Sequence, residues 1–218
     1  MVYNLSNQNS LVGEIVSEIR DVSIQMDRMR FRRNLERLGE IFAYEISKKM
    51  PMKVKEIQTP LGISECTVLK RQPVIGTILR AGLPMHTGLL NMFDKADNAF
   101  ISAYRKHHKS GKFTIKMEYV SCPDLEGRIV ILSDPMLATG ASMALTIKQL
   151  FEYGEPEHIH VVVAIACTVG IDEIRKNFSK DKVTIWAAAI DEELTAKGYI
   201  VPGLGDAGDL SFGEKLQD

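Results

Sequence analysis

The chain has 218 residues, a formal net charge of −1, 45% hydrophobic residues and 25% charged residues. These values are typical of a globular α/β domain, and they exclude the broad positive charge that many nucleic-acid-binding proteins carry. The longest apolar run, Val161 to Cys167, is far too short to cross a membrane, and the N-terminal residues lack the basic and apolar regions of a signal peptide.

A long helix is predicted from Met29 to Met50, because apolar residues recur at helical spacing from Leu35 to Ile46 and Pro51 ends the pattern. Four arginines lie near its start: Arg28, Arg30, Arg32 and Arg33. They allow two interpretations, a phosphate-binding patch or a solvated or inter-subunit face of an N-terminal arm. Glutamates follow the arginines along the helix, which favours the second interpretation.

From Val74 onward, predicted strands and helices alternate. Short apolar runs predict strands at 74–79, 99–103, 128–132, 160–166 and 183–188, and helical spacing predicts helices at 83–93, from 141 onward and near 171–178. This alternation predicts an α/β fold with a mainly parallel sheet flanked by helices. Ligands of such sheets bind beyond the carboxyl ends of the strands.

Two arginines follow predicted strands directly. Arg80 comes after the strand at 74–79 and leads into Ala81-Gly82, and Arg105 comes after the strand at 99–103. Two guanidinium groups at one edge of the sheet suit a pyrophosphate, because each planar fork binds phosphate oxygens in pairs. On its own, Arg105 would be interpreted as a surface arginine.

The stretch between the second and third strands has a different pattern. Apolar residues alternate with polar ones there, which predicts a half-exposed hairpin flap rather than another core strand: Phe113, Ile115, Met117 and Tyr119. The nearby His107 and His108, like His158 and His160 farther on, have no cysteine or carboxylate partner at ligand spacing. We therefore expect exposed histidines rather than a zinc site.

The segment from Gly127 to Ile147 changes from strand to loop to helix. A loop before a helix N-terminus presents main-chain N–H groups and the positive end of the helix dipole, which together suit a phosphate. Thr139 and Ser142 add hydroxyl groups. The Asp134 carboxylate would repel a phosphate, so it predicts a different partner such as a sugar diol or a metal ion. Taken alone, the segment fits an ordinary strand-to-helix turn with an Asp/Thr cap about equally well.

Two motifs carry a resemblance to a known family. The sequence DPMLATG at 134–140 resembles the phosphoribosyl-pyrophosphate (PRPP) loop of type I phosphoribosyltransferases, and Pro135 in place of a second acid resembles the uracil phosphoribosyltransferases in particular. GYIVPGLGDAGD at 198–209 resembles that family's uracil-binding segment. Shorter matches occur at 38–51, 59–62, 78–83 and 104–105, so the resemblance covers about Arg28 to Gly213.

The resemblance implies one phosphoribosyltransferase domain over 1–218, with an N-terminal helical arm at about 1–50, a β-hairpin flap and a C-terminal base-binding hood at about 190–218. The implied reaction joins uracil to PRPP and gives UMP and pyrophosphate. Mg²⁺ would bind mainly through PRPP, with no direct protein ligand. The resemblance leaves open which group accepts the uracil N1 proton.

Matching the motifs residue by residue implies the site residues. Asp134, Arg80 and Arg105 would be catalytic. The implied PRPP-binding residues are Arg80, Arg105, Asp134, Pro135, Met136, Leu137, Ala138, Thr139, Gly140, Ala141, Ser142 and Asp206. The implied uracil-binding residues are Ile200, Gly205, Asp206 and Ala207.

Some positions depart from the family pattern. Lys106-His107 replace an acidic pair, Pro84 and Ala141 replace glycines, and Leu210 replaces an arginine. These departures concern the flap, the subunit contacts and nucleotide regulation. The resemblance further implies a homodimer or higher homo-oligomer and GTP as a possible effector. Three scattered cysteines without a CxxC pair predict a reducing, cytoplasmic location.

Two other hypotheses stay open at this point. The first is a phosphoribosyltransferase for another base, or an RNA-binding regulator that keeps the fold. Such proteins usually have the second acid that Pro135 replaces, and a regulator would need a basic face. The second is a non-catalytic nucleotide-sensing module, which would be expected to lack Arg80 or Asp134.

Overall fold

The computed structural model describes residues 1–107 and 113–215, without the side chains of 103–118. The strands in these residues are β1 (Val2–Asn4), β2 (Met52–Thr59), β3 (Gly62–Leu69), β4 (Val74–Leu79), β5 (Asp97–His107), β6 (Phe113–Ser121), β7 (Ile129–Ser133), β8 (Met136–Leu137), β9 (His158–Cys167), β10 (Val183–Asp191), β11 (Glu193–Leu194) and β12 (Ile200–Val201). The α-helices are α1 (Leu11–Arg20), α2 (Arg28–Ser47), α3 (Leu83–Met92), α4 (Ala141–Leu150), α5 (Thr168–Asn177) and α6 (Ala207–Phe212).

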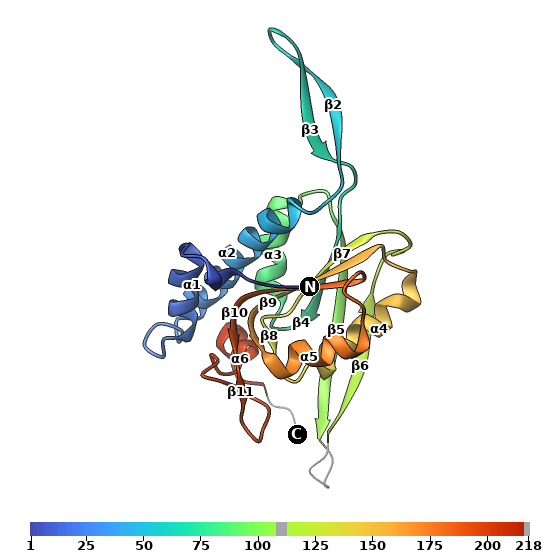
Figure 1. Ribbon diagram of the computed structural model, residues 1–218. Coiled ribbons are helices and arrows are strands. Elements are labelled where there is room, and N and C mark those ends of the chain that lie inside the picture. The colour runs from blue at the N-terminus through green and yellow to red at the C-terminus, as the bar shows by residue number, and fades with distance from the viewer. Residues whose placement is uncertain (108–112, 216–218) are drawn as a thin grey trace.

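A central sheet has the strand order β1-β10-β9-β7-β4-β5-β6, and β8 also pairs with β9 (Figure 1). Every pairing in it is parallel except that of β5 with β6. The structure therefore confirms the predicted α/β fold with a mainly parallel sheet. The sequence did not reveal β1, because three residues are too short to show a period.

Helices cover both faces of the sheet. In β9, Val162 and Ala164 belong to the core formed with α1, α2 and α3, whereas Val161 and Val163 belong to the core formed with α4 and α5. Successive side chains of a strand point to opposite faces, so a strand buried on both sides is an unbroken apolar run. The two helical layers are seen on either side of the sheet in Figure 1.

The flap region differs partly from its prediction. β5 is longer than the predicted 99–103, because antiparallel pairing with β6 continues it to His107. Arg105 consequently lies within the strand, opposite Ile115, and does not follow the strand as predicted. The alternating segment does form a hairpin with β5, and its strand β6 is the edge strand of the central sheet.

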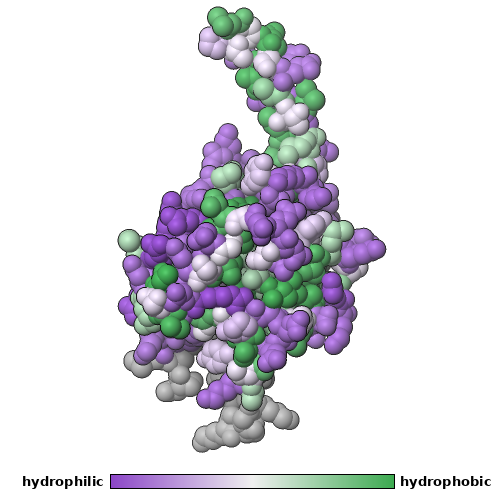
Figure 2. Space-filling view, turned by 60° about the vertical axis from the view of Figure 1, so that its left-hand side comes forward, coloured by the Kyte–Doolittle hydropathy of each residue, from purple (hydrophilic) through white to green (hydrophobic). Residues whose placement is uncertain are grey.

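The β2–β3 hairpin projects from the body of the molecule (Figures 1 and 2). Its two strands pair in register from Met52 opposite Leu69 to Thr59 opposite Gly62. Large apolar side chains along it are exposed, among them Val54 at 66%, Leu61 at 100% and Ile63 at 70%. Large contiguous apolar patches on a protein surface are typical of interaction sites.

His158 and His160 are not exposed as predicted, and the side chains of His107 and His108 lie outside the described residues. His160 is only 6% exposed, and its Nδ1 accepts a hydrogen bond of 3.2 Å from the indole Nε1 of Trp186. His158 is half-buried, with Nε2 at 2.9 Å from the Thr184 hydroxyl. The reason is that β10 pairs with β9, so that Thr184 and Trp186 of β10 lie against the two histidines. The pKa of His160 is lowered from 6.5 to about 3, mainly by burial and to a smaller extent by the nearby His158.

This lowered pKa predicts a loss of stability in acid. The unfolded chain binds a proton at His160 below pH 6.5, whereas the folded chain does not until about pH 3, so stability falls as the pH drops through that window. The expected slope from this group is about 1.4 kcal/mol per pH unit at most. Urea unfolding at pH 7, 6 and 5 should show a shallower dependence for His160→Gln than for the wild type. Equal slopes in the two proteins would contradict the assignment.

Candidate active site

The loops that carry the predicted site residues meet at the carboxyl edge of the sheet. A Cβ on Gly82 would lie 2.6 Å from the Ser133 carbonyl, so the loop after β4 packs directly against the end of β7. A Cβ on Gly208 would lie 3.9 Å from the Ala81 Cβ, so the C-terminal segment reaches the same place. Figure 1 shows α6 and β11 at the end of the molecule opposite the β2–β3 hairpin.

The loop between β7 and α4 is held along one side by β9. The Asp134 N–H donates to the Val162 carbonyl at 3.2 Å, and the Ile165 N–H donates to the Pro135 carbonyl at 2.9 Å. The Asp134 carboxylate accepts a hydrogen bond of 3.3 Å from the Met136 N–H. These bonds fix the main chain around Asp134.

The N-terminus of α4 begins at Gly140, which has a φ of +81° and provides no side-chain cap. The predicted Asp/Thr cap is weak, because the Thr139 hydroxyl is 3.5 Å from the Ala141 N–H. A left-handed residue suits glycine here, since a side chain would be strained at this φ. Among the described residues, the geometry thus favours an anion-binding helix start over an ordinary capped turn.

Close packing against α5 supports this loop from behind. A Cβ on Gly140 would lie 2.7 Å from the Gly170 carbonyl, and a Cβ on Gly170 would lie 2.5 Å from the Ala138 carbonyl. The absence of side chains at both positions brings the two main chains together. The position of the predicted phosphate loop is therefore determined by its contact with α5.

Arg80 directly follows β4 at the carboxyl edge of the sheet. Its Nη2 donates to an Asp209 carboxylate oxygen at 3.2 Å and to the Gly213 carbonyl at 3.4 Å, and its side chain is 42% exposed. Arg105 lies three residues beyond Ser102, the partner of Leu79 at the end of β4. Its main chain therefore extends past the same edge, and its side chain is outside the described part of the structure.

Asp206 is half-buried and caps α6 by accepting a hydrogen bond of 2.9 Å from the Asp209 N–H. The Lys215 ammonium donates to its other oxygen at 3.0 Å. Burial on its own raises the pKa of Asp206, but the hydrogen bonds from Asp209 and Lys215 outweigh burial and bring the pKa below its usual value. Asp206 is therefore an ionised carboxylate at neutral pH.

The predicted uracil-binding residues lie together in the C-terminal segment. Ile200 is buried in β12, which pairs with β11, and Ala207 is buried at the start of α6. Gly205 is exposed between them with a φ of +93°, and a Cβ there would have only Leu210 within 4 Å, at 4.0 Å. The main chain of this loop is therefore accessible, as main-chain recognition of a flat base requires.

Sequence reasoning missed how the arginines at the start of α2 are used. Arg32 donates to the Ser211 carbonyl at 2.7 Å, and Arg28 lies against Gly213. The other two form ion pairs within the arm, Arg30 with Glu18 and Arg33 with Glu36. The arginines thus hold the C-terminal helix and the arm together, which agrees with the arm interpretation better than with a phosphate patch.

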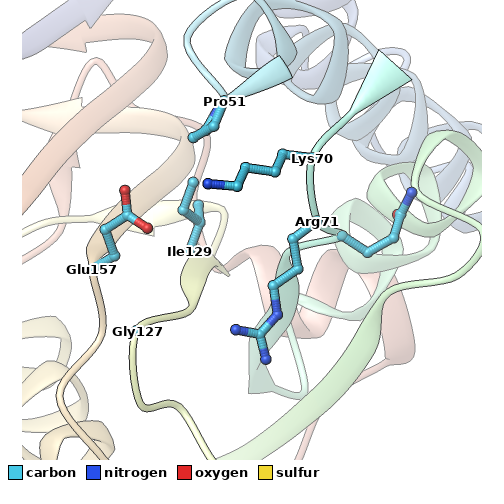
Figure 3. Close-up of a pocket in the computed structure, with 7 residues that line it drawn as sticks. Pro51, Lys70, Arg71, Gly127, Ile129 and Glu157 are labelled. Atoms are coloured by element: carbon cyan, nitrogen blue, oxygen red, sulfur yellow. The ribbon is translucent and has the colours of Figure 1, made fainter. Parts of the chain in front are cut away.

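A cavity of about 330 Å³ lies at the opposite edge of the sheet, near the base of the β2–β3 hairpin. Figure 3 shows Lys70, Arg71 and Glu157 around it, with Pro51 and Ile129. It is remote from the loops described above, so it is not the predicted site. Within the described chain, no three His, Cys, Asp or Glu side chains are grouped to hold a metal ion, and no helix could span a membrane.

Comparisons with known proteins agree with these motifs. Residues 6–214 match the family model described as uracil phosphoribosyltransferase. A uracil phosphoribosyltransferase of Porphyromonas gingivalis is 54% identical over 99% of both chains. Another, from Pyrococcus furiosus, is 40% identical over 94% of this chain and 88% of its own length.

Solved structures show the same fold. The AQ2163 protein from Aquifex aeolicus superposes with a TM-score of 0.87 over 100% of both chains at 30% identity. A phosphoribosyltransferase from Corynebacterium diphtheriae gives a TM-score of 0.50 at 16% identity, over 82% of this chain and 96% of its own. The second likeness concerns the fold alone.

The contact between the loop and α5 predicts the effect of adding one methyl group. Gly170→Ala should destabilise the protein by about 1–3 kcal/mol, because the Cβ would overlap the Ala138 carbonyl. Gly13→Ala is a matched control, since Gly13 is also the third residue of a ten-residue helix and has nothing within 4 Å of its Cβ position. The control should be neutral or gain up to about 1 kcal/mol. Equal unfolding free energies for the two variants would refute the contact.

Proposed function

The chain belongs to the uracil phosphoribosyltransferase family, and from that premise we propose which of its residues carry out the reaction. It transfers the 5-phosphoribosyl group of PRPP to uracil, which gives UMP and pyrophosphate in pyrimidine salvage. Residues 1–218 act as one phosphoribosyltransferase domain in this proposal. Relatives at 54% and 40% identity that share this activity favour uracil over another base.

The loop from Asp134 to Ser142 binds PRPP. The observation that carries this assignment is the start of α4, where Gly140 leaves the helix without a side-chain cap. Its N–H groups and the helix dipole bind the 5′-phosphate, with the hydroxyls of Thr139 and Ser142. The remaining residues of the loop line the PRPP site through their main chain: Pro135, Met136, Leu137, Ala138 and Ala141.

Asp134 acts on the ribose. Its carboxylate follows β7 directly and binds the ribose hydroxyls, so it stabilises the positive charge that develops on the ring as pyrophosphate leaves. The leaving group is already good, so the protein mainly orients the reactants and stabilises charge. This role needs a fixed carboxylate, and the main-chain bonds around Asp134 provide one.

Arg80 and Arg105 bind the pyrophosphate. Arg80 pairs with Asp209, and pyrophosphate oxygens would replace that carboxylate. Mg²⁺ would bind mainly through PRPP, and the ionised Asp206 would help to hold it there. When bound, the metal neutralises charge on the leaving pyrophosphate. The residues present fit this arrangement, because the carboxylates of Asp206 and Asp209 lie next to Arg80.

Uracil is recognised by the main chain of the C-terminal segment. Its alternating donors and acceptors match the N–H and C=O groups of Ile200, Gly205 and Ala207, and Asp206 lies on the ribose side. Cytosine presents a donor where the main chain expects an acceptor. We expect the kcat/KM for cytosine to be lower than that for uracil by a factor on the order of 10⁴.

We extend the proposal to a homo-oligomer in the cytoplasm. The β2–β3 hairpin, with its exposed Val54, Leu61 and Ile63, suits contact with a second copy of the chain. The three cysteines, Cys66, Cys122 and Cys167, are all free, as in a reducing compartment. A molar mass measured by light scattering tests the oligomeric state.

The remaining part of the proposal is a GTP effector at the cavity of Figure 3. Lys70 and Arg71 line this cavity, and both cations can bind phosphate oxygens. The Glu157 carboxylate across the cavity can accept N–H groups of a guanine. Initial rates with and without GTP, for the wild type and for Lys70→Ala, test this part separately from the reaction itself.

The role of Asp134 predicts the outcome of a neutral substitution. Asp134→Asn should fold but lose about 100-fold or more in kcat, because an amide cannot stabilise cationic charge on the ribose as a carboxylate does. Asp172→Asn is the control, because it also removes one carboxylate but lies exposed on α5. Steady-state kinetics with uracil and PRPP measure both variants. Wild-type turnover in Asp134→Asn would remove this residue from the mechanism.

Main-chain recognition of uracil predicts the effect of a side chain at Gly205. Gly205→Val should raise the KM for uracil strongly and the KM for PRPP much less, since its methyl groups would occupy the open space beside the loop and strain the φ of +93°. Gly127→Val is a matched control at the opposite edge, with a φ of +61° and open space around its Cβ. An unchanged KM for uracil in Gly205→Val would mean that another part of the chain reads the base.

A further inference from the structure

We propose that Arg20 and Asp191 are positioning residues for uracil, a role that rests on the assignment of the base to the C-terminal segment. The two residues form a clamp, here meaning their ion pair together with the main chain of Gly203. Neither residue lies in the motifs that carry the family resemblance. The clamp connects α1 to the loop that reads the base.

The ion pair is bidentate and largely shielded from solvent. Arg20 Nη1 donates to Asp191 Oδ2 and Nη2 donates to Oδ1, both at 2.8 Å. The Asp191 side chain is 8% exposed and that of Arg20 is 22% exposed. Arg20 ends α1 and Asp191 ends β10, so the pair joins two elements of regular structure. Two parallel bonds between planar groups fix their relative orientation.

The same two side chains bind both polar groups of the Gly203 main chain. The Gly203 N–H donates to Asp191 Oδ2 at 3.0 Å, and the Gly203 carbonyl accepts from Arg20 Nη1 at 2.9 Å. Gly203 is buried, and a Cβ there would lie 2.2 Å from the Ile200 carbonyl. The main chain of Gly203 therefore packs directly against Ile200, which only a residue without a side chain allows. The ion pair holds this turn in place.

Gly203 lies between the two parts of the uracil site. Ile200 precedes it by three residues, and Gly205 to Ala207 follow it. A base read by main-chain groups depends on their separation, so a shift at Gly203 changes the spacing between the two parts. A misplacement of about 1 Å can cost about 100-fold, and for main-chain groups that bind the base we expect this loss in the KM for uracil. The side-chain hydrogen bonds of Arg20 go to Asp191 and Gly203, so the PRPP loop should not respond.

Arg20→Lys tests the clamp, because it keeps the charge and removes the planar fork. The KM for uracil should rise by about 10- to 100-fold, while the KM for PRPP and kcat at saturating uracil stay within about threefold. Arg128→Lys is the matched control. Arg128 pairs with Asp97 at 2.8 Å with 10% of its side chain exposed, and it directly precedes β7, away from the site. Its substitution should lower the Tm without raising the KM for uracil.

Several results would overturn the proposal. One is an unchanged KM for uracil in Arg20→Lys, and another is an equal rise in the KM for uracil and for PRPP. If Arg20→Lys does not fold, the double variant Arg20→Gln, Asp191→Asn is measured in its place, because it leaves no unpaired buried charge. A rise in the KM for uracil with Gly205→Val but not with the clamp variants refutes the clamp alone. No rise with Gly205→Val refutes the assignment of the base to this loop.

Discussion

The parallel pairing of β4 with β7 is the constraint on which the rest of the site depends. Thr77 lies beside Ser133 in this register, and the Ser133 hydroxyl donates to the Gly76 carbonyl at 3.1 Å. The pairing ends both strands at one edge, so the Arg80 and Asp134 loops leave the sheet side by side. A slip of one residue would turn the side chains of β7 to the wrong faces and move Asp134 away from Arg80.

Much of this site consists of main chain rather than side chains. The proposed phosphate loop uses N–H groups at the start of α4, and the proposed base loop uses N–H and C=O groups near Gly205. Such groups cannot be changed by mutation, but their positions can, and those positions are determined by neighbours such as Gly170 on α5 and Gly203 in the clamp. Residues without ligand contact can therefore control affinity.

The sequence predicted the parallel core well and its edges poorly. The strands at 74–79 and 128–132 agree with the structure within one residue, because strands buried on both faces are distinct apolar runs. β1 and the antiparallel extension of β5 were missed, since pairing partners far along the chain determine them. The motifs indicated Arg80, Asp134 and Gly205 as site residues. The clamp has no local pattern, because Arg20 and Asp191 are 171 residues apart.

The same separation has a consequence for the order in which the protein folds. β1 pairs with β10, and α1 and α2 bind the segment after β10 through Arg20 and Arg32. During synthesis, the N-terminal elements must remain without these partners until residues 183–211 have been made. Contacts this distant in sequence form late and slow folding. We therefore expect the base-binding half of the site to be absent from nascent chains whose sheet is already largely paired, so that this half is the last part of the site to form.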